Sequence, residues 1–151
     1  MKNIDAIMPE LANYIADHKQ FNKAISEASV GWHLEHSLLV IKQITSTVAQ
    51  SEPKLYKSKF NLTRFFVFLS KTIPRGKAKA PKVVIPADNI TSETLQESLK
   101  NTYQAIAYLK DCQEKQYFMH PIFGQLNKKQ TIKFLAIHTE HHLKIIRAIL
   151  K

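Results

Sequence analysis

Two histidines near the C-terminal end of the chain, His138 and His142, have a spacing that suits metal binding. At the helical period of about 100° per residue, both fall on the face that carries the apolar side chains of residues 128–151, and the charged side chains fall opposite. Positions i and i+4 stand one turn apart, with about 5–6 Å between their Cβ atoms. Two imidazoles at this spacing reach one ion at about 2.0–2.1 Å from each nitrogen. The sequence therefore predicts a helix that presents two metal ligands from its buried face.

The alternative is that these imidazoles are packed core residues without a metal. An inward histidine usually packs and forms hydrogen bonds, but a pair on one face needs partners for both nitrogens of each ring. The pair is not the HExxH motif of zinc proteases, because Thr139 stands where that motif has glutamate. Glu140 points away from the apolar face, and His141 lies at its edge.

Composition predicts one helical domain that spans residues 1–151. The chain has three glycines, long helix-compatible segments and a length that suits a single core. Cys112 is the only cysteine, which excludes an internal disulfide and fits a reducing cytoplasm. The N-terminal residues include an acid and a proline where a signal peptide needs an apolar run. No segment approaches the about 18–20 apolar residues of a membrane span, so we expect a cytoplasmic protein.

The net charge of +10 is concentrated between Pro53 and Ala87. This segment has nine bases and no acid: Lys54, Lys57, Lys59, Arg64, Lys71, Arg75, Lys77, Lys79 and Lys82. A basic, loop-rich segment attracts phosphates, anionic substrates or acidic lipid heads, or is a solvated loop. No nucleic-acid-binding fold or motif accompanies the charge, so we expect no specific nucleic-acid binding.

Apolar periodicity predicts four long helices, over residues 3–17, 29–50, 91–113 and 128–151. Side chains suited to N-caps precede three of them: Ser26 or Ser29, Thr91 or Ser92, and Asn127 with Gln130 in a capping box. The predicted fold is therefore all-α, an antiparallel four-helix bundle with a long crossover between the second and third helices.

The crossover, residues 51–89, contains four prolines and is predicted to carry little strand. Within it, residues 62–70 (LTRFFVFLS) predict a short helix or turn whose apolar side chains pack over one end of the bundle. We expect its phenylalanines in the core; a pocket wall or a homodimer contact is the alternative. Residues 75–86 are predicted as an extended loop, and residues 116–126 as a short loop.

A third histidine ligand is expected from the second helix, because bundle interiors build metal sites from facing helices. The di-iron version needs Glu-x-x-His pairs, and no histidine here has glutamate three residues before it. A histidine-only site remains, with His138 and His142 joined by His33 or His36. Periodicity alone does not choose between those two.

Three motifs in this order resemble the DinB-like superfamily: Trp32-x-x-x-His36, His-Pro-x-Phe-Gly at residues 120–124, and His138-x-x-x-His142. The resemblance covers nearly the whole chain and is closest to an uncharacterised branch with the HPxFG loop before the last helix. It implies a divalent metal ion on His36, His138 and His142, which selects His36 over His33 and leaves out His141. We expect their ring nitrogens to lie within about 3–3.5 Å of one another, or to bind one ion at about 2.0–2.1 Å.

The resemblance also implies a class of chemistry, because members with known activity include metal-dependent S-transferases and isomerases that use low-molecular-weight thiols. Three neutral imidazoles leave an ion its full double charge, so it lowers the pKa of a bound water or thiol. We expect an enzyme acting on a small-molecule substrate, a thiol S-transferase or a hydrolase, with Zn, Ni or Fe. His120 and His141 are general-base candidates, and His33 a supporting one. The alternative is a non-catalytic bundle that binds a metal or an anion.

Overall fold

The computed structural model describes residues 3–74 and 80–151, and within them the chain is mostly helical with one small sheet. The elements are α1 Ile4–Asn13, α2 Val30–Gln50, α3 Leu62–Ser70, α4 Ser92–Asp111, β1 Tyr117–His120, β2 Gly124–Asn127 and α5 Lys128–Ile149. Short 3₁₀ turns follow α1 at Ile15–Asp17 and interrupt the crossover at Pro53–Leu55 and Lys82–Val84. The helical class is thus confirmed. In the described part of the chain, no helix has the length and apolar character needed to cross a membrane.

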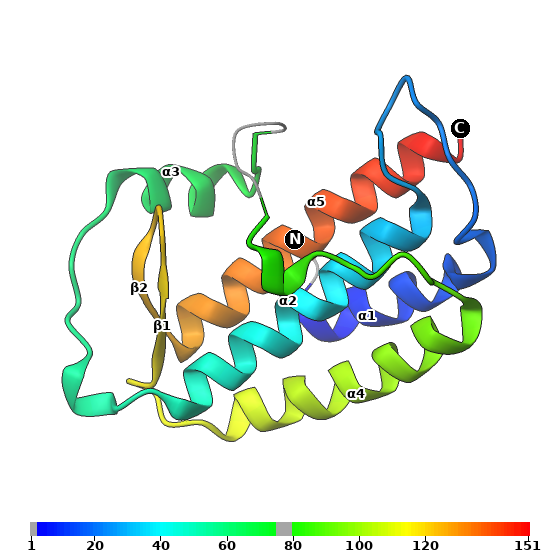
Figure 1. The fold of residues 1–151 in the computed structure, drawn as a ribbon. Helices are drawn as coiled ribbons and strands as arrows, with labels where there is room; N and C mark the ends of the chain where they lie inside the picture. The colour runs from blue at the N-terminus through cyan, green and yellow to red at the C-terminus, as the bar shows by residue number, and fades with distance from the viewer. Residues whose placement is uncertain (1–2, 75–79) are drawn as a thin grey trace.

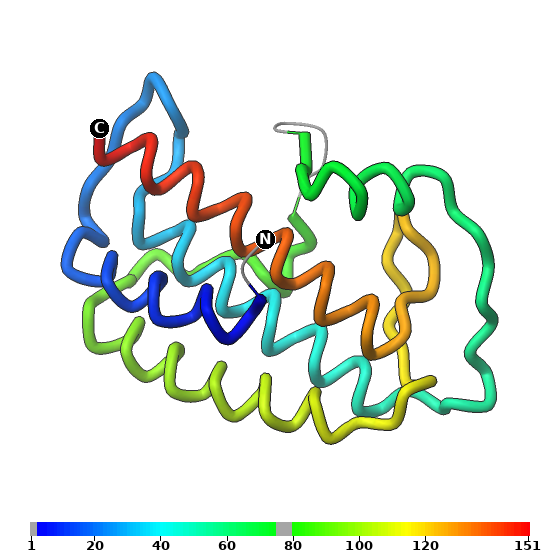
Figure 2. The backbone as a smooth tube through the Cα atoms, turned by 180° about the vertical axis from the view of Figure 1, so that it is seen from behind, coloured from blue at the N-terminus to red at the C-terminus, as the bar shows by residue number. Residues whose placement is uncertain are grey.

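Helix α2 lies at the centre of the structure and packs against both α4 and α5, while α1 packs against α5 and α4. Helices α2 and α4 run in the same direction, opposite to α1 and α5 (Figures 1 and 2). Two consecutive long helices run parallel because the crossover carries the chain back along the length of α2. The specific four-helix bundle of the DinB-like type stays a prediction.

Three predicted caps fix where the long helices begin. Ser29 Oγ accepts the Trp32 amide, and Thr91 Oγ1 accepts the Thr94 amide. Asn127 and Gln130 form the predicted reciprocal box, in which each side chain accepts the backbone N–H of the other. Each such cap stabilises its helix by about 1 kcal/mol. The caps of α2 and α5 set the helical phase of the two elements that carry the histidine motifs.

The predicted loop at residues 116–126 is instead a β-hairpin, which also corrects the strictly all-α prediction. Strands β1 and β2 pair antiparallel, from Tyr117 opposite Asn127 to His120 opposite Gly124. Gly124 has φ of +71°, a left-handed conformation that glycine adopts without strain. Phe118 and Leu126 are buried, and the Phe118 ring lies 6.0 Å from that of Phe134 on α5. The hairpin therefore covers the N-terminal end of α5.

The predicted short helix in the crossover is confirmed as α3, but its expected place in the core is wrong. No residue of α3 is buried, and Phe65 and Phe66 are 49% and 56% exposed. Only Val67 and Phe68 are half-buried and packed against the core. Of the predicted extended loop at residues 75–86, residues 75–79 lie outside the described residues, and Lys82–Val84 forms a 3₁₀ turn.

A close backbone approach at Gly31 generates a stability prediction. The Gly31 amide donates to the His18 carbonyl at 2.8 Å, and a Cβ at this position would lie 2.9 Å from that oxygen. The added Cβ would force the backbone of His18 away from α2. We therefore expect Gly31→Ala to lower the free energy of unfolding by about 1–3 kcal/mol, even though alanine has a higher helix propensity than glycine. Urea unfolding measures the change. Gln43→Ala, at an exposed site on the same helix, is the control and should change stability by less than about 0.5 kcal/mol; a neutral Gly31→Ala would contradict the close packing.

Candidate metal centre

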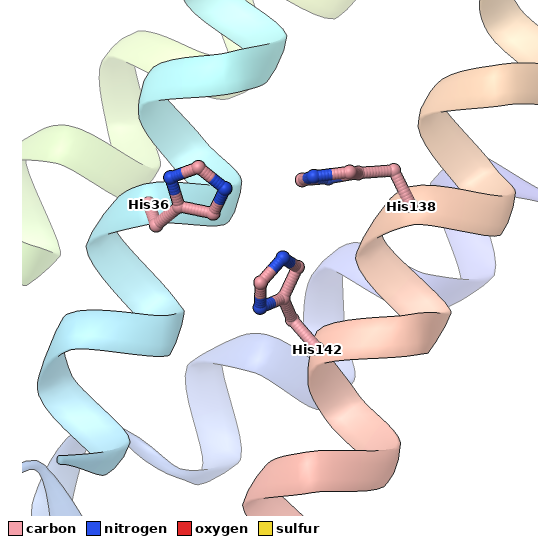
Figure 3. Close-up of side chains that lie close together, drawn as sticks. All are labelled: His36, His138 and His142. Carbon is pink, nitrogen blue, oxygen red and sulfur yellow. The ribbon is translucent and has the colours of Figure 1, made fainter. Parts of the chain in front are cut away.

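Three histidines from two facing helices converge in the interior: His36 from α2, and His138 and His142 from α5. Each ring contributes one nitrogen to a group of three that lie within 4.8 Å of one another. The three rings point toward one another (Figure 3). These are the residues that the sequence motifs select. The bound of 4.8 Å is wider than the expected 3–3.5 Å. Three ligands at about 2.1 Å from one ion lie about 3.4–3.6 Å apart, so nitrogens at the 4.8 Å bound would have to approach each other by about 1.2–1.4 Å around a metal.

His36 is held in the orientation and tautomer of a metal ligand. Its Nδ1 lies 2.7 Å from the carbonyl oxygen of Val84 in the 3₁₀ turn of the crossover. Because a carbonyl only accepts, Nδ1 carries the proton and the lone pair remains on Nε2. Burial lowers the pKa of His36, so the ring is neutral near pH 7. Trp32, one turn earlier, stacks on the His36 ring at 4.8 Å and fixes its plane.

His142 is oriented by a second histidine, His33 of α2. The two Nδ1 atoms lie 3.0 Å apart, so one ring donates and the other accepts. His33 Nε2 lies 3.0 Å from Ser26 Oγ, which also accepts the Ala28 amide. A consistent direction runs from His142 Nδ1–H to His33 Nδ1, and from His33 Nε2–H to Ser26. This direction leaves Nε2 of His142 with a free lone pair.

His138 is the ring whose hydrogen bonding is incomplete. Its Nδ1 is buried and has no hydrogen-bond partner in residues 3–74 and 80–151. Leaving a buried polar atom without a partner costs about 1–3 kcal/mol. An ion bound between the rings supplies a partner to such an atom, so this orphaned nitrogen fits a metal site.

The electrostatics of the cluster favour cation binding near neutral pH. Burial, and then the neighbouring histidines, lower the pKa of His138 to about 3 and that of His142 well below its usual value. The rings are therefore neutral at pH 7 and no proton has to leave before a metal binds. The metal-capable group found in the described chain contains only histidines, so a divalent ion held there would keep its full charge.

The general-base candidate His120 lies outside this cluster. Its Nδ1 accepts the amides of Ile122 and Phe123, which closes the hairpin turn, and its ring stacks on Phe123 at 4.2 Å. The Phe134 ring contacts both histidines: its centroid lies 4.9 Å from that of His120 and 5.8 Å from that of His138. Burial lowers the pKa of His120 to about 4. These contacts give His120 a role in the turn; its catalytic role stays a prediction.

His141, the other general-base candidate, lies at the rim of the cluster. Its ring meets that of His142 edge to face at 5.3 Å, and it is half-exposed, as its place at the edge of the apolar face predicts. His141 is absent from the convergent group found in the described residues. Cys112 is a buried thiol at the end of α4, and burial raises its pKa.

Sequence reasoning missed the two contacts that orient the ligands. The Val84 carbonyl comes from backbone 48 residues away from His36, and no side-chain pattern marks it. The sequence marks Ser26 only as a cap for α2. It offers His33 as the third ligand or as a supporting residue, and the structure places it against His142.

Together these features define a mostly helical protein with a buried cluster of three histidines shared by two facing helices. The chain belongs to the family described as a protein of unknown function (DUF1569), which it matches over residues 5–148. Searches of curated proteins and of solved structures found no match to the chain. The match confirms an uncharacterised family; the relation to the DinB-like superfamily stays a prediction.

The lowered pKa values predict that the metal-free protein loses stability in acid. Four histidines have folded pKa values below that of the unfolded chain: His36 and His142, which are buried, and His120 and His138, which are half-buried. As the pH falls below about 6.5, the unfolded state binds protons first, so stability is complete above that pH and declines toward pH 3–4. Each histidine lowers the free energy of unfolding by at most about 1.4 kcal/mol for each pH unit of acidification.

Urea unfolding with chelator present, at about pH 7 and about pH 5, measures this loss. His138→Gln should reduce the difference between the two midpoints, because one titrating ring is removed. Equal midpoints in the unmodified protein would contradict the buried neutral state of the cluster.

Proposed function

We propose that His36, His138 and His142 bind one divalent metal ion and that the protein is a metal-dependent enzyme acting on a small molecule. The observation that carries the proposal is the buried, unpartnered Nδ1 of His138 beside two rings whose other nitrogens are already fixed. Imidazole binds Zn, Ni and Fe alike, so the ligand set admits any of these. The proposal includes the DinB-like four-helix bundle, supported by the parallel course of α2 and α4.

The reaction that fits this ligand set is activation of a thiol or water nucleophile, in a thiol S-transferase or a hydrolase. A divalent ion on three neutral ligands lowers the pKa of a bound thiol or water and thereby supplies the nucleophile at neutral pH. The Val84 carbonyl holds the His36 imidazole in place. His33, itself bonded to Ser26, holds the His142 imidazole. Trp32 and Phe134 line the cluster with rings that exclude water. His141 at the rim is the nearest general-base candidate.

A non-catalytic metal-binding protein is the second candidate, and the burial of the cluster favours it. His36 and His142 are only 5% and 8% exposed, which resembles a closed site, although His138 is half-buried. A structural metal contributes directly to folding, whereas a catalytic ion keeps a position for substrate. Loss of folding on metal removal would therefore support this second candidate.

The metal site predicts specific losses in three variants. His36→Ala, His138→Ala and His142→Ala should each lower bound metal from about one ion per chain to less than about 0.2, because two imidazoles bind a divalent ion weakly. Protein purified without a nickel column is analysed for metal by mass spectrometry. Added Co²⁺ or Ni²⁺ should also quench Trp32, the only tryptophan, which stacks on His36.

His141→Ala is the matched control, since it removes a neighbouring imidazole on the same helix, and it should keep its metal and its quenching. Circular dichroism shows whether each variant folds. Full metal occupancy in the His36 variant would overturn the ligand assignment. Consumption of a low-molecular-weight thiol that chelator abolishes would separate the enzyme from the non-catalytic candidate.

His33 tests the orienting contact independently of the ligands. Removing the partner of a ligating histidine typically weakens metal affinity about 10–100-fold. We expect His33→Ala to raise the Kd for Zn²⁺ by that factor, while the stoichiometry at saturating metal stays at one. A competitive titration against a chromogenic chelator measures both quantities. If His33→Ala abolished binding at saturation, His33 would be a ligand in place of His142.

A further inference from the structure

Helix α3 presents an apolar face that no other described residue covers. Leu62, Phe65, Phe66 and Leu69 are 49–66% exposed, and Phe60 just before the helix is 78% exposed. At about 100° per residue, these four helical side chains fall within an arc of about 100°. Arg64, Val67 and Phe68 occupy the opposite side and are half-buried against the protein. The outward apolar stripe is therefore separate from the side that anchors the helix.

The exposure of this stripe is built into the fold, because α3 is fastened to the hairpin. Asn61 caps α3 through the Arg64 amide and donates from Nδ2 to the carbonyl of Ile122. The Arg64 guanidinium donates to the carbonyls of Phe123 and Gln125. On the inner side, Lys133 of α5 lies 5.0 Å above the Phe68 ring. The helix lies at the edge of the molecule, beside the hairpin (Figure 1).

The charge around the stripe has a single sign. Between residues 54 and 71 there are five bases and no acid: Lys54, Lys57, Lys59, Arg64 and Lys71. All four lysines are exposed, and three of them lie in the loop that leads to α3. Exposed aromatic and leucine side chains flanked by lysines are typical of segments that lie in the interface of an anionic bilayer.

We propose that α3 and the preceding loop, residues 54–71, form a docking surface for an anionic phospholipid membrane, on which the protein lies peripherally. The lysines match the negative surface potential of such a bilayer, and the phenylalanines and leucines enter the boundary between headgroups and acyl chains. A second copy of the chain is a poor occupant, because a two-fold axis would bring two equally basic loops together. This inference is independent of the metal site.

Co-sedimentation of the full chain with vesicles tests the proposal. We expect binding to phosphatidylcholine vesicles that contain about 30% phosphatidylserine and at least about tenfold weaker binding to pure phosphatidylcholine. Raising NaCl from about 0.05 to about 0.5 M should weaken the binding at least about tenfold, because the attraction of the lysines is screened. Absence of binding to the anionic vesicles, or equal binding to both kinds, would overturn the proposal.

Paired variants separate the two contributions. Phe65→Ser with Phe66→Ser, and Lys57→Glu with Lys59→Glu, should each weaken binding to anionic vesicles at least about fivefold. The matched controls are Tyr103→Ser with Tyr108→Ser, exposed rings on α4, and Lys100→Glu with Lys144→Glu, which change the net charge equally. Both controls should bind as the unmodified chain does. Equal losses in controls and test variants would show unspecific attraction and overturn the proposal.

Two further outcomes identify a different occupant and would also overturn it. Light scattering that shows a dimer without lipid, abolished by the Phe65 and Phe66 changes, would assign the stripe to a second copy. Tighter binding to duplex DNA than to anionic vesicles, unaffected by the phenylalanine changes, would assign the lysines to a polyanion. Circular dichroism confirms that each variant keeps its helical content.

Discussion

The need to give every buried imidazole nitrogen a partner is the constraint on which the arrangement around the site depends. An apolar core offers few acceptors, and unpaired polar atoms there are costly. The chain brings partners from three separate places: the Val84 carbonyl from the crossover for His36, and His33 with Ser26 for His142. Nδ1 of His138 has none in the described chain, and the lone pairs on Nε2 of His36 and His142 remain free. The Val84 contact ties the crossover to α2, and the contact between His33 and His142 ties α2 to α5, so the first of these polar contacts also fixes where the crossover runs.

The crossover consequently has two parts with opposite orientations. Its later part is drawn inward, where Val84 is buried and contacts His36. Its earlier part is held outward, where α3 is fastened by backbone carbonyls of the hairpin rather than by its phenylalanines. The hairpin packs on Phe134 of α5 and anchors α3, so it connects the outward part of the crossover to the helix that carries His138 and His142. The site and the exposed stripe thus share their supporting elements without sharing residues.

What the sequence predicts correctly is what local physics determines. The caps at Ser29, Thr91 and Asn127 and the inward place of the α5 histidine pair follow from N-cap chemistry and helical period, whereas the choice of His36 over His33 rests on the resemblance alone. The incorrect predictions concern features that depend on long-range contacts or on weak sequence patterns. Strands of four residues are too short for an alternating pattern to distinguish, so the hairpin was predicted as a loop. The α3 phenylalanines were predicted in the core, but apolar residues are often exposed, and only packing decides.

The surroundings of the cluster indicate that the fold supports the site more than the site supports the fold. Both helices also carry fully buried aliphatic side chains along their length, among them Leu34, Leu38 and Ile41 of α2 and Leu135, Ile137 and Leu143 of α5. Burying such a side chain stabilises a protein by about 1.5–3 kcal/mol, which exceeds what a metal-free imidazole with an unpartnered nitrogen contributes. Because the aliphatic core holds α2 and α5 together regardless, the helices keep the ligands close before any ion arrives, as a preorganised site for a reactive metal requires.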